Sequence, residues 1–293
     1  MISVIICSIN KKFAEQVQKN IAQTIGVIWE PIVIDNKISP LGITQVYNAA
    51  ASKAQYDILC FVHEDILFQT QNWGVTLLNH FKNDVKLGLI GVAGSKYKSK
   101  TPSGWFTGCS ELDCCNITHL SSDDKQQIIN LNPNPGLPAQ QVVVLDGVFL
   151  CCPKTIWEEV KFNDTLLKDF HLYDLDFSCR IAENYKVIVT FEINILHIVK
   201  GNHYGNSWLE PTLLWHKTMK KKLPAFLPTL DLRIHQFENK ILRTWLIRLK
   251  HENINLSNRL RWLLYIRIWA NISAWPFVFL FLFKNVFTKR QSK

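Results

Sequence analysis

Apolar and polar positions follow two different periods along the first ninety residues of the chain. Continuous apolar runs are typical of strands buried on both faces of a sheet, and apolar residues three or four apart mark one face of a helix. The predicted strands cover 2–8, 31–34, 57–62 and 87–93, and the predicted helices cover 13–25, 43–54 and 73–81. Strands that alternate with helices predict βαβ units around a mostly parallel sheet, and therefore an α/β fold.

The middle of the chain interrupts this pattern with a polar segment. Ser, Asp, Asn, Gln and Pro dominate residues 95–140, which predicts a long and mostly irregular insertion. The remaining predicted elements are a strand at 142–150, helices at 156–160 and 173–184, and a strand region at 186–198. Together these elements predict one domain over residues 1–230.

The last part of the chain, residues 231–293, has a different character. It contains 12 Lys and Arg against 3 Asp and Glu, whereas residues 1–230 contain 21 of each kind, so the tail holds the whole net charge of +9. Basic and apolar residues alternate there at helical spacing, which predicts basic amphipathic helices on an anionic membrane surface. The apolar run from Trp269 to Phe283 is shorter than the roughly 20 residues of a spanning helix.

The eight cysteines carry no recognisable pattern. They occupy positions 7, 60, 109, 114, 115, 151, 152 and 179, and no pair has the Cys-x-x-Cys spacing of a zinc site. Several lie in runs predicted to be buried strands, where a free Cys acts as a small apolar side chain. We therefore expect free cysteines in a reducing compartment rather than a disulfide framework.

Polar side chains follow three of the predicted strands at the point where each strand ends. Ser8 ends the first strand, Asp35 follows the second, and His63, Glu64 and Asp65 follow the third. Ligands of an open parallel sheet bind beyond the carboxyl ends of its strands, so these residues predict one binding rim. The chain has no glycine-rich phosphate-binding motif. A diphosphate bound at this rim would therefore need a metal held by carboxylate and imidazole groups.

Six short segments of the chain occur in a characteristic order. They are the first strand, Asp35, Val46-Tyr47-Asn48, Phe61 to Asp65, Val144 to Gly147, and Phe170 to Asp176. In this order they resemble the inverting GT-A glycosyltransferases of the family 2 type, and in particular a small bacterial subgroup whose acidic motif is His-x-Asp. The resemblance covers residues 1 to about 220 and implies a Rossmann-like GT-A sheet flanked by helices.

This resemblance implies a nucleotide-sugar donor bound along the rim. Asp35 is expected to bind the base or the ribose, and Asn48 is expected to lie near it. Ser8 and Glu64, at the ends of their strands, are expected to belong to the same donor-binding side of the site.

The same resemblance implies a divalent metal, Mn²⁺ or Mg²⁺, at the donor diphosphate. His63 and Asp65 occupy the place of the usual Asp-x-Asp motif, and His197 matches a late histidine that completes the site in some relatives. His63 therefore stands at both the metal and the donor. The segment Asp146-Gly147 is expected to line the donor sugar.

The catalytic base is expected at the start of the helix predicted over 173–184. Asp174 and Asp176 match a Glu-Asp-x-Asp motif whose second residue is the base in this family, which makes Asp174 the expected base. Helix capping is the alternative reason for both acids, because carboxylates favour the positive end of a helix. Trp105 and Tyr173 are the candidates for acceptor contact, and Trp105 has the alternative role of a packing anchor.

These patterns favour an inverting glycosyltransferase that moves a sugar from a nucleotide-diphosphate sugar to a lipid-linked or glycan acceptor. The family implies bacterial surface polysaccharide or lipopolysaccharide assembly, and the tail predicts a cytoplasmic protein peripheral to the inner face of the cell membrane. A catalytically inactive GT-A-like membrane scaffold and a nucleotidyltransferase are the alternatives. The neutral body argues against nucleic-acid binding. We expect removal of residues 236–293 to release the protein from membranes and to leave donor binding intact.

Overall fold

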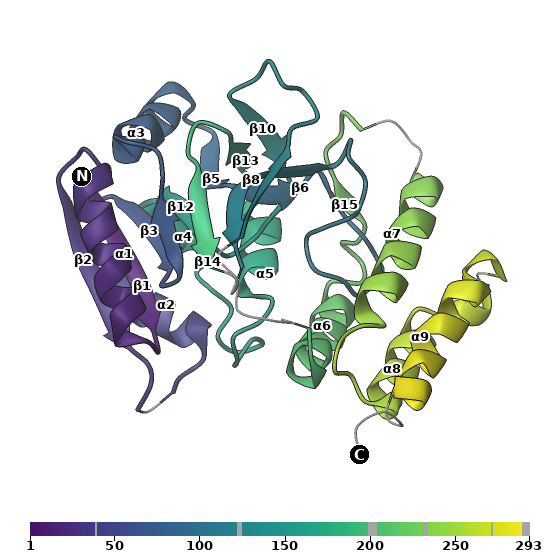
Figure 1. Cartoon of the computed structure of the whole chain (residues 1–293). Helices are drawn as coiled ribbons and strands as arrows, with labels where there is room; N and C mark the ends of the chain where they lie inside the picture. Colours follow the sequence, from purple (N-terminus) through teal and green to yellow (C-terminus); the bar gives the residue numbers. More distant parts are fainter. Residues whose placement is uncertain (39, 122–124, 199–203, 231–233, 271, 289–293) are drawn as a thin grey trace.

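A mixed seven-stranded sheet forms the centre of the molecule (Figure 1). The computed structural model describes the whole chain except residues 39, 122–124, 199–203, 231–233, 271 and 289–293. In spatial order the strands are β10 (Ala139–Val142), β13 (Lys186–Thr190), β5 (Leu87–Gly91), β12 (Phe149–Pro153), β3 (Ile58–His63), β1 (Ile2–Ser8) and β2 (Trp29–Asp35). All but β10 and β12 share one direction. The predicted α/β fold with a mostly parallel sheet is confirmed.

Helices cover both faces of this sheet because its central strands are apolar on both sides. One face packs against α1 (Lys11–Thr24) and α3 (Trp73–Asn83), and the other against α2 (Ile43–Ala51), α4 (Lys154–Val160) and α5 (Tyr173–Ile181). Within β1, Val4 and Ile6 join the first apolar cluster and Ile5 joins the second. Successive side chains of a strand point to opposite faces, so the continuous apolar run of β1 follows from burial on both sides.

A second sheet of six strands is the main feature that the sequence pattern did not predict, and two of its strands lie entirely within residues 95–140. Its strands are β4 (Ile66–Phe68), β6 (Ala93–Ser95), β8 (Asp113–Leu120), β9 (Gln126–Leu131), β11 (Val144–Leu145) and β14 (Ile195–Ile198). The segment Asp113–Thr118 of β8 is buried although half of its residues are polar. Asn116 explains this, since its amide donates to the carbonyl oxygens of Phe191 and Ile193 at 3.1 and 3.0 Å. Buried polar side chains with backbone partners conceal a strand from the hydropathy pattern.

The C-terminal helices pack against the domain. They are α6 (Asn206–Thr218), α7 (Ile234–Leu249), α8 (Leu256–Tyr265), η1 (Ile268–Ala270), η2 (Ile272–Ala274) and α9 (Trp275–Thr288). Trp245 of α7 is fully buried, and its ring stacks on Trp208 of α6 with 5.4 Å between the centroids. Ile241, Leu246 and Leu249 belong to the same apolar cluster, which also contains domain residues. The apolar side of α7, which the sequence assigned to a membrane, is therefore buried in protein.

Exposed apolar side chains remain on α8, η1 and α9. Leu264 is 62% exposed, Trp269 56% and Phe279 65%. Within the described part of the chain, no helix is both long enough and apolar enough to cross a bilayer.

Residues 97–108 run between the second sheet and the C-terminal helices, which hold them at three points. The Glu238 carboxylate of α7 accepts hydrogen bonds from Tyr97 Oη and Ser99 Oγ, both at 2.7 Å, and from the Lys100 backbone N–H. Trp262 Nε1 donates to the carbonyl oxygen of Pro102, and Trp245 Nε1 to that of Phe106, each at 2.9 Å. A two-stranded ribbon of β7 (Tyr97–Lys98) and β15 (Ala225–Phe226) begins the segment. We call residues 97–108 the bridging loop.

One pair of cysteines corrects the expectation of free thiols throughout. Cys60 on β3 and Cys151 on β12 form a disulfide, and the antiparallel register places the two residues directly opposite each other. Their separation of 91 residues hides this pairing in the sequence. The other six cysteines are free, and all of them except Cys7 are buried.

Replacement of Trp245 tests whether α7 is part of the folded domain. We expect Trp245→Ala to lower the free energy of unfolding by about 3–5 kcal/mol, because it removes a buried indole and the hydrogen bond to Phe106. Denaturant titration measures this loss. Trp269→Ala, at an exposed position in the same tail, is the control and should change stability by less than about 0.5 kcal/mol. Equal effects of the two changes would contradict the packing described above.

Candidate functional site

Side chains from separate segments surround a cavity of about 430 Å³ at the end of β3. The segments include the turn after β3, the turn after β11, the start of α5, the strand β14 and the bridging loop. Eight residues predicted from the sequence line the cavity, namely His63, Asp65, Trp105, Asp146, Gly147, Tyr173, Asp174 and His197. The fold thus gathers residues that lie up to 134 positions apart.

His63, Asp65 and His197 form a group of potential metal ligands. His63 ends β3 and Asp65 lies in the turn to β4, while the antiparallel pairing of β14 with β4 sets His197 opposite Ile66. The Ile198 backbone N–H also donates to the carbonyl oxygen of Asp65, which fixes the strand beside the turn. One ligand atom from each residue lies within 4.8 Å of the others. Imidazole nitrogen and carboxylate oxygen together suit Mn²⁺ and related divalent ions.

The electrostatics of this group favour a cation. Asp65 Oδ1 is buried and has no hydrogen-bond donor among the described residues, and it lies 3.6 Å from His197 Nε2 and 4.0 Å from His63 Nδ1. A buried carboxylate oxygen without a partner is costly, so the group is suited to hold a positive ion. Burial lowers the pKa of His197 to about 4, against the opposing effect of Asp65. His197 is therefore neutral at physiological pH, as a metal ligand must be.

Asp174 lies across the cavity in the first turn of α5. Leu172, with φ of 67°, turns the chain into this helix through a left-handed conformation. The Gly147 backbone N–H donates to Asp174 Oδ2 at 2.9 Å, and the Tyr173 hydroxyl donates to the Gly147 carbonyl oxygen at 3.0 Å. A Cβ atom at Gly147 would lie 2.1 Å from that hydroxyl, so the close approach requires glycine. Burial, and after it the negative charge of Asp146, raises the pKa of Asp174 to about 7.

Trp105 of the bridging loop is bonded to Asp146. Its Nε1 donates to Asp146 Oδ2 at 2.6 Å, while the Val148 backbone N–H donates to Oδ1 at 2.9 Å. Trp105 therefore has two roles, because it lines the cavity and also holds the Asp146 carboxylate in place. The contacts of Trp245 and Trp262 with the bridging loop support this arrangement. The expectation that residues 236–293 are dispensable for the donor site does not agree with these contacts.

The other predicted donor residues form a polar rim on neighbouring strands. Ser8 and Asp35 are opposite each other in the parallel register of β1 and β2, and Cys7 is opposite His63 in that of β1 and β3. Glu64 Oε2 accepts hydrogen bonds from Ser8 Oγ at 2.6 Å and from the Asn10 backbone N–H at 3.0 Å. Asp35 is exposed, and two strand spacings place it roughly 10 Å from His63.

Two predicted site residues, Asn48 and Asp176, lie outside both the cavity and the polar rim. Asn48 of α2 uses its side chain to bind the segment around Phe162, accepting from Trp157 Nε1 and donating to the Phe162 carbonyl oxygen. Asp176 is buried, accepts from Trp215 Nε1 at 2.9 Å and pairs with Arg180 at 2.7 Å. Residues two apart on a helix do not face the same side, which separates Asp176 from Asp174.

Tyr173 has its hydroxyl in the cavity wall rather than in open space. The side chain is buried, and Tyr173 Oη lies 2.7 Å from His63 Nε2 in addition to its bond with Gly147. Tyr173 therefore connects the histidine of the metal group to the segment that holds Asp174. This position makes it a positioning residue rather than an acceptor contact.

Two residues near the cavity have no predicted role. Phe170 is 54% exposed, lines the cavity and has its ring centroid 5.7 Å from that of His63. His119 lies opposite His197 in the register of β8 and β14, with 5.5 Å between the ring centroids. Phe170 could have been found from the sequence as an isolated Phe in a polar loop. His119 could not, because its position depends on a strand pairing that the sequence does not reveal.

The family to which the chain belongs follows from its match to a family model. The model described as "Glycosyltransferase like family" matches residues 3–209, a range that contains every residue lining the cavity. The chain belongs to this glycosyltransferase family. The resemblance to GT-A glycosyltransferases of the family 2 type is thereby confirmed.

Two solved glycosyltransferase structures are similar to this chain. GalNAc-T7 with UDP, GalNAc and Mn²⁺ has a TM-score of 0.53 at 11% identity, over 82% of this chain and 54% of that chain. The mannosyltransferase PcManGT from Pyrobaculum calidifontis in complex with GDP-Man and Mn²⁺ has a TM-score of 0.49 at 13% identity, over 98% and 87%. The likeness to GalNAc-T7 shows the GT-A fold, and this glycosyltransferase chain spans about half the length of that protein. The curated proteins include no match.

The metal group is testable through Asp65. We expect Asp65→Asn to weaken Mn²⁺ binding at least about tenfold, because it removes the buried charge between the two histidines. Isothermal titration with Mn²⁺ measures the affinity. Asp57→Asn, an exposed acid just before β3, is the matched control and should bind Mn²⁺ as the wild type does. Unchanged affinity in Asp65→Asn would exclude this group as the metal site.

The raised pKa of Asp174 predicts a dependence of stability on pH. Between the ordinary value of 3.8 and about 7, the unfolded chain loses the Asp174 proton while the folded chain keeps it, so this group destabilises the fold as pH rises. We expect Asp174→Asn to be more stable than the wild type at about pH 8, with the advantage shrinking towards about pH 4. Unfolding titrations of both proteins across this range measure the difference, and an Asn variant less stable at the alkaline end would contradict the assignment.

Proposed function

We propose that this protein is an inverting glycosyltransferase that moves a sugar from a nucleotide-diphosphate donor to an acceptor hydroxyl. The observation that carries the proposal is the presence, in one cavity, of a cation site at Asp65 and of Asp174, whose pKa lies near neutrality. Inverting transfer needs a positive centre for the departing diphosphate and a base for the acceptor hydroxyl. The UDP and Mn²⁺ bound in the GalNAc-T7 structure support this donor and metal class.

The metal group holds the donor diphosphate through a divalent ion, Mn²⁺ or Mg²⁺. His63, Asp65 and His197 fit such an ion because an unpartnered carboxylate oxygen lies between two imidazoles. The bound ion supplies Lewis-acid stabilisation of the negative charge on the diphosphate oxygens. Tyr173 keeps the His63 ring in place through its hydroxyl.

Asp174 acts as the general base. As the acceptor oxygen attacks the anomeric carbon, its proton passes to the Asp174 carboxylate, and the bond from that carbon to the diphosphate breaks with the electron pair leaving on the diphosphate oxygen. The Gly147 N–H holds Oδ2 and orients the carboxylate for this transfer. A base with a pKa near the working pH combines availability with proton affinity. Asp176, saturated by Arg180 and Trp215, supports α5 and takes no part in the transfer.

The polar rim binds the nucleotide. Asp35 at the open end of β2 contacts the base or ribose, while Ser8 and Glu64 form the wall between it and the diphosphate. The distance of roughly 10 Å between Asp35 and His63 suits a nucleoside laid across two strands. Asp146, fixed by Trp105, faces the donor sugar.

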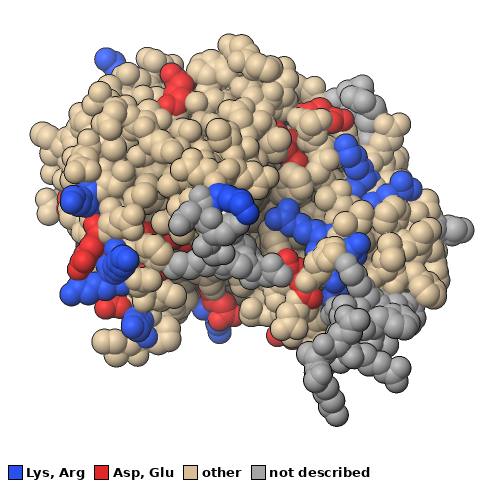
Figure 2. All heavy atoms as spheres, viewed as in Figure 1, with Lys and Arg blue, Asp and Glu red and all other residues tan. Residues whose placement is uncertain are grey.

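The acceptor is a lipid-linked or glycan hydroxyl of bacterial surface polysaccharide or lipopolysaccharide assembly, and the protein works on the cytoplasmic face of the cell membrane. Exposed Leu264, Trp269 and Phe279 supply apolar contact with the interface. Lys and Arg side chains gather over the region of α7 in the face shown in Figure 2, which suits anionic lipid. The alternatives, an inactive scaffold and a nucleotidyltransferase, give no role to the base position of Asp174.

Turnover of nucleotide-sugars by an Asp174 variant tests the proposal. We expect the wild type to bind one of UDP, GDP, dTDP or CMP with Mn²⁺, and to hydrolyse or transfer the matching sugar at a rate that rises with pH and levels off above about 7. Asp174→Asn should keep nucleotide binding and lose turnover by roughly 10²–10⁴-fold, because only the base is removed. Asp57→Asn is the control. A folded wild type that binds nucleotide but never turns over any sugar would favour the scaffold instead.

A further inference from the structure

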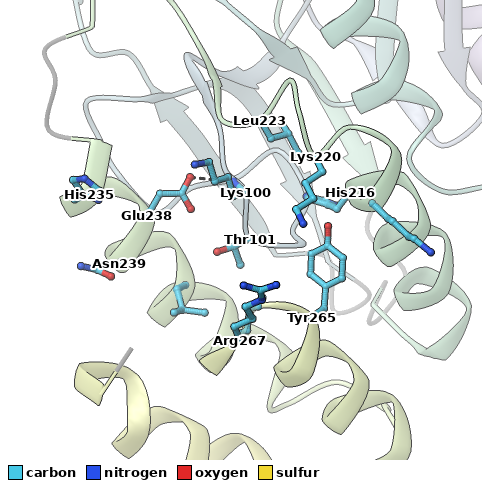
Figure 3. A pocket seen from close by; sticks show the side chains of 13 residues that line it. Lys100, Thr101, His216, Lys220, Leu223, His235, Glu238, Asn239, Tyr265 and Arg267 are labelled. Atoms are coloured by element: carbon cyan, nitrogen blue, oxygen red, sulfur yellow. Dashed lines mark hydrogen bonds between the residues drawn. The ribbon is translucent and has the colours of Figure 1, made fainter. Parts of the chain in front are cut away.

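A second and larger cavity, of about 1030 Å³, lies between α6, α7, α8 and the bridging loop (Figure 3). It shares no lining residue with the cavity at Asp174. Four side chains with permanent positive charge line it, and they come from three segments of the chain: Lys100, Lys217, Lys220 and Arg267. Glu238 is the one acidic residue among the lining residues. We call this space the basic cavity.

The positive charge of the basic cavity is only partly offset by the acids that the structure describes there. Glu238 already accepts hydrogen bonds from Tyr97, Ser99 and the Lys100 backbone N–H. Within the described part of the chain, none of the four cations forms an ion pair, whereas Lys222 nearby pairs with Glu183. A concave surface lined by one sign of charge concentrates the field and attracts counter-ions.

Arg267 occupies the cavity at a cost in backbone energy. It follows α8 and has φ of 51°, a left-handed conformation in which glycine is normally found after a helix. A non-glycine side chain is sterically strained in this conformation, whereas glycine is not. Figure 3 shows the Arg267 guanidinium facing the same space as Lys220 and Tyr265. Such strain at a cavity-lining arginine indicates a role beyond ending the helix.

The wall behind the cavity adds a buried lysine, and no described acid bonds to it. Lys98 is buried, and its Nζ contacts Ser103 Oγ at 2.8 Å and His216 Nε2 at 3.0 Å. His216 in turn lines the basic cavity. Burial lowers the pKa of Lys98 to about 7, and an anion in the cavity would favour the charged form of this lysine.

We propose that the basic cavity binds a phosphate group of a ligand distinct from the sugar donor. Cations converging from three segments, namely the bridging loop, the end of α6 and the turn after α8, suit an anion with several oxygens. The arginine fork binds phosphate through two parallel hydrogen bonds. Leu223, Leu242 and Ile266 add apolar lining, and exposed Leu264 and Trp269 flank the lining segment of α8. These apolar neighbours favour a lipid as the source of the phosphate, a step that rests on the proposed membrane function, whereas phosphate binding itself does not.

Two charge variants test the proposal on the full chain. Lys220→Gln with Arg267→Gln removes two charges inside the cavity, and Lys221→Gln with Lys250→Gln removes two charges outside its lining. Arg267→Gly is a further cavity variant that relieves the left-handed strain, and it should fold at least as stably as the wild type. Titration with inorganic pyrophosphate in the presence of chelator measures phosphate binding while the metal-dependent donor site is silent.

We expect each cavity variant to bind pyrophosphate at least tenfold more weakly than the wild type, and the outer variant to bind it unchanged. Co-sedimentation with phosphatidylcholine vesicles, with and without phosphatidylglycerol, distinguishes a lipid phosphate from the phosphate of a soluble ligand. Loss of binding to the anionic vesicles in the cavity variants alone supports a lipid phosphate. Normal vesicle binding together with lost pyrophosphate binding supports a soluble phosphate ligand and rejects the lipid source.

Equal pyrophosphate binding by the cavity variants, the outer variant and the wild type would overturn the proposal. Nucleotide binding with Mn²⁺, measured on the same samples, keeps this result separate from the proposed function. If neither the wild type nor any variant binds nucleotide, the proposed glycosyltransferase function is contradicted. The comparison of pyrophosphate binding remains valid in that case, because it uses no metal.

Discussion

Three carboxylates share the cavity at the end of β3, and the way each negative charge is balanced determines the rest of the site. Asp146 is balanced by the Trp105 indole N–H and the Val148 backbone N–H. Asp174 receives the Gly147 N–H and otherwise retains a proton up to about neutral pH. Asp65 has a buried oxygen with no donor, so its charge calls for a cation. One cavity thus contains a carboxylate suited to hold a proton and a carboxylate suited to hold a metal, because their surroundings differ.

This balance depends on helices far along the chain. Trp105 reaches Asp146 only because the bridging loop is fixed, and the loop is fixed by Glu238, Trp245 and Trp262. The indole rings of the two tryptophans are fully buried, so their hydrogen bonds to loop carbonyls form where water cannot compete. The C-terminal helices are therefore part of the support of the candidate active site.

The sequence predicted those parts of the fold in which apolar residues are buried and charged residues lie at the ends of strands. The uninterrupted apolar run of β1 required burial on two faces, and acids at strand ends required a common rim. The sequence did not predict the strand β8, because Asn116 is buried there with backbone hydrogen-bond partners. It also did not predict the disulfide of Cys60 and Cys151, because only the pairing of β3 with β12 brings these residues together. Helix geometry alone would have separated Asp174 from Asp176, since residues two apart face different sides.

The amphipathic tail shows that a helix can be predicted correctly while the surface that its apolar side contacts is not. An apolar stripe on a basic helix fits a lipid interface and a protein surface equally well, because both remove apolar area from water. In α7 the apolar stripe packs against Trp208 and other residues of the same apolar cluster. The basic side chains also have more than one surface open to them, because Arg267, which follows α8, converges with Lys100 and Lys220 of the domain on one cavity. The lining of that cavity is therefore built jointly by the domain and the tail, so an anion bound there contacts both.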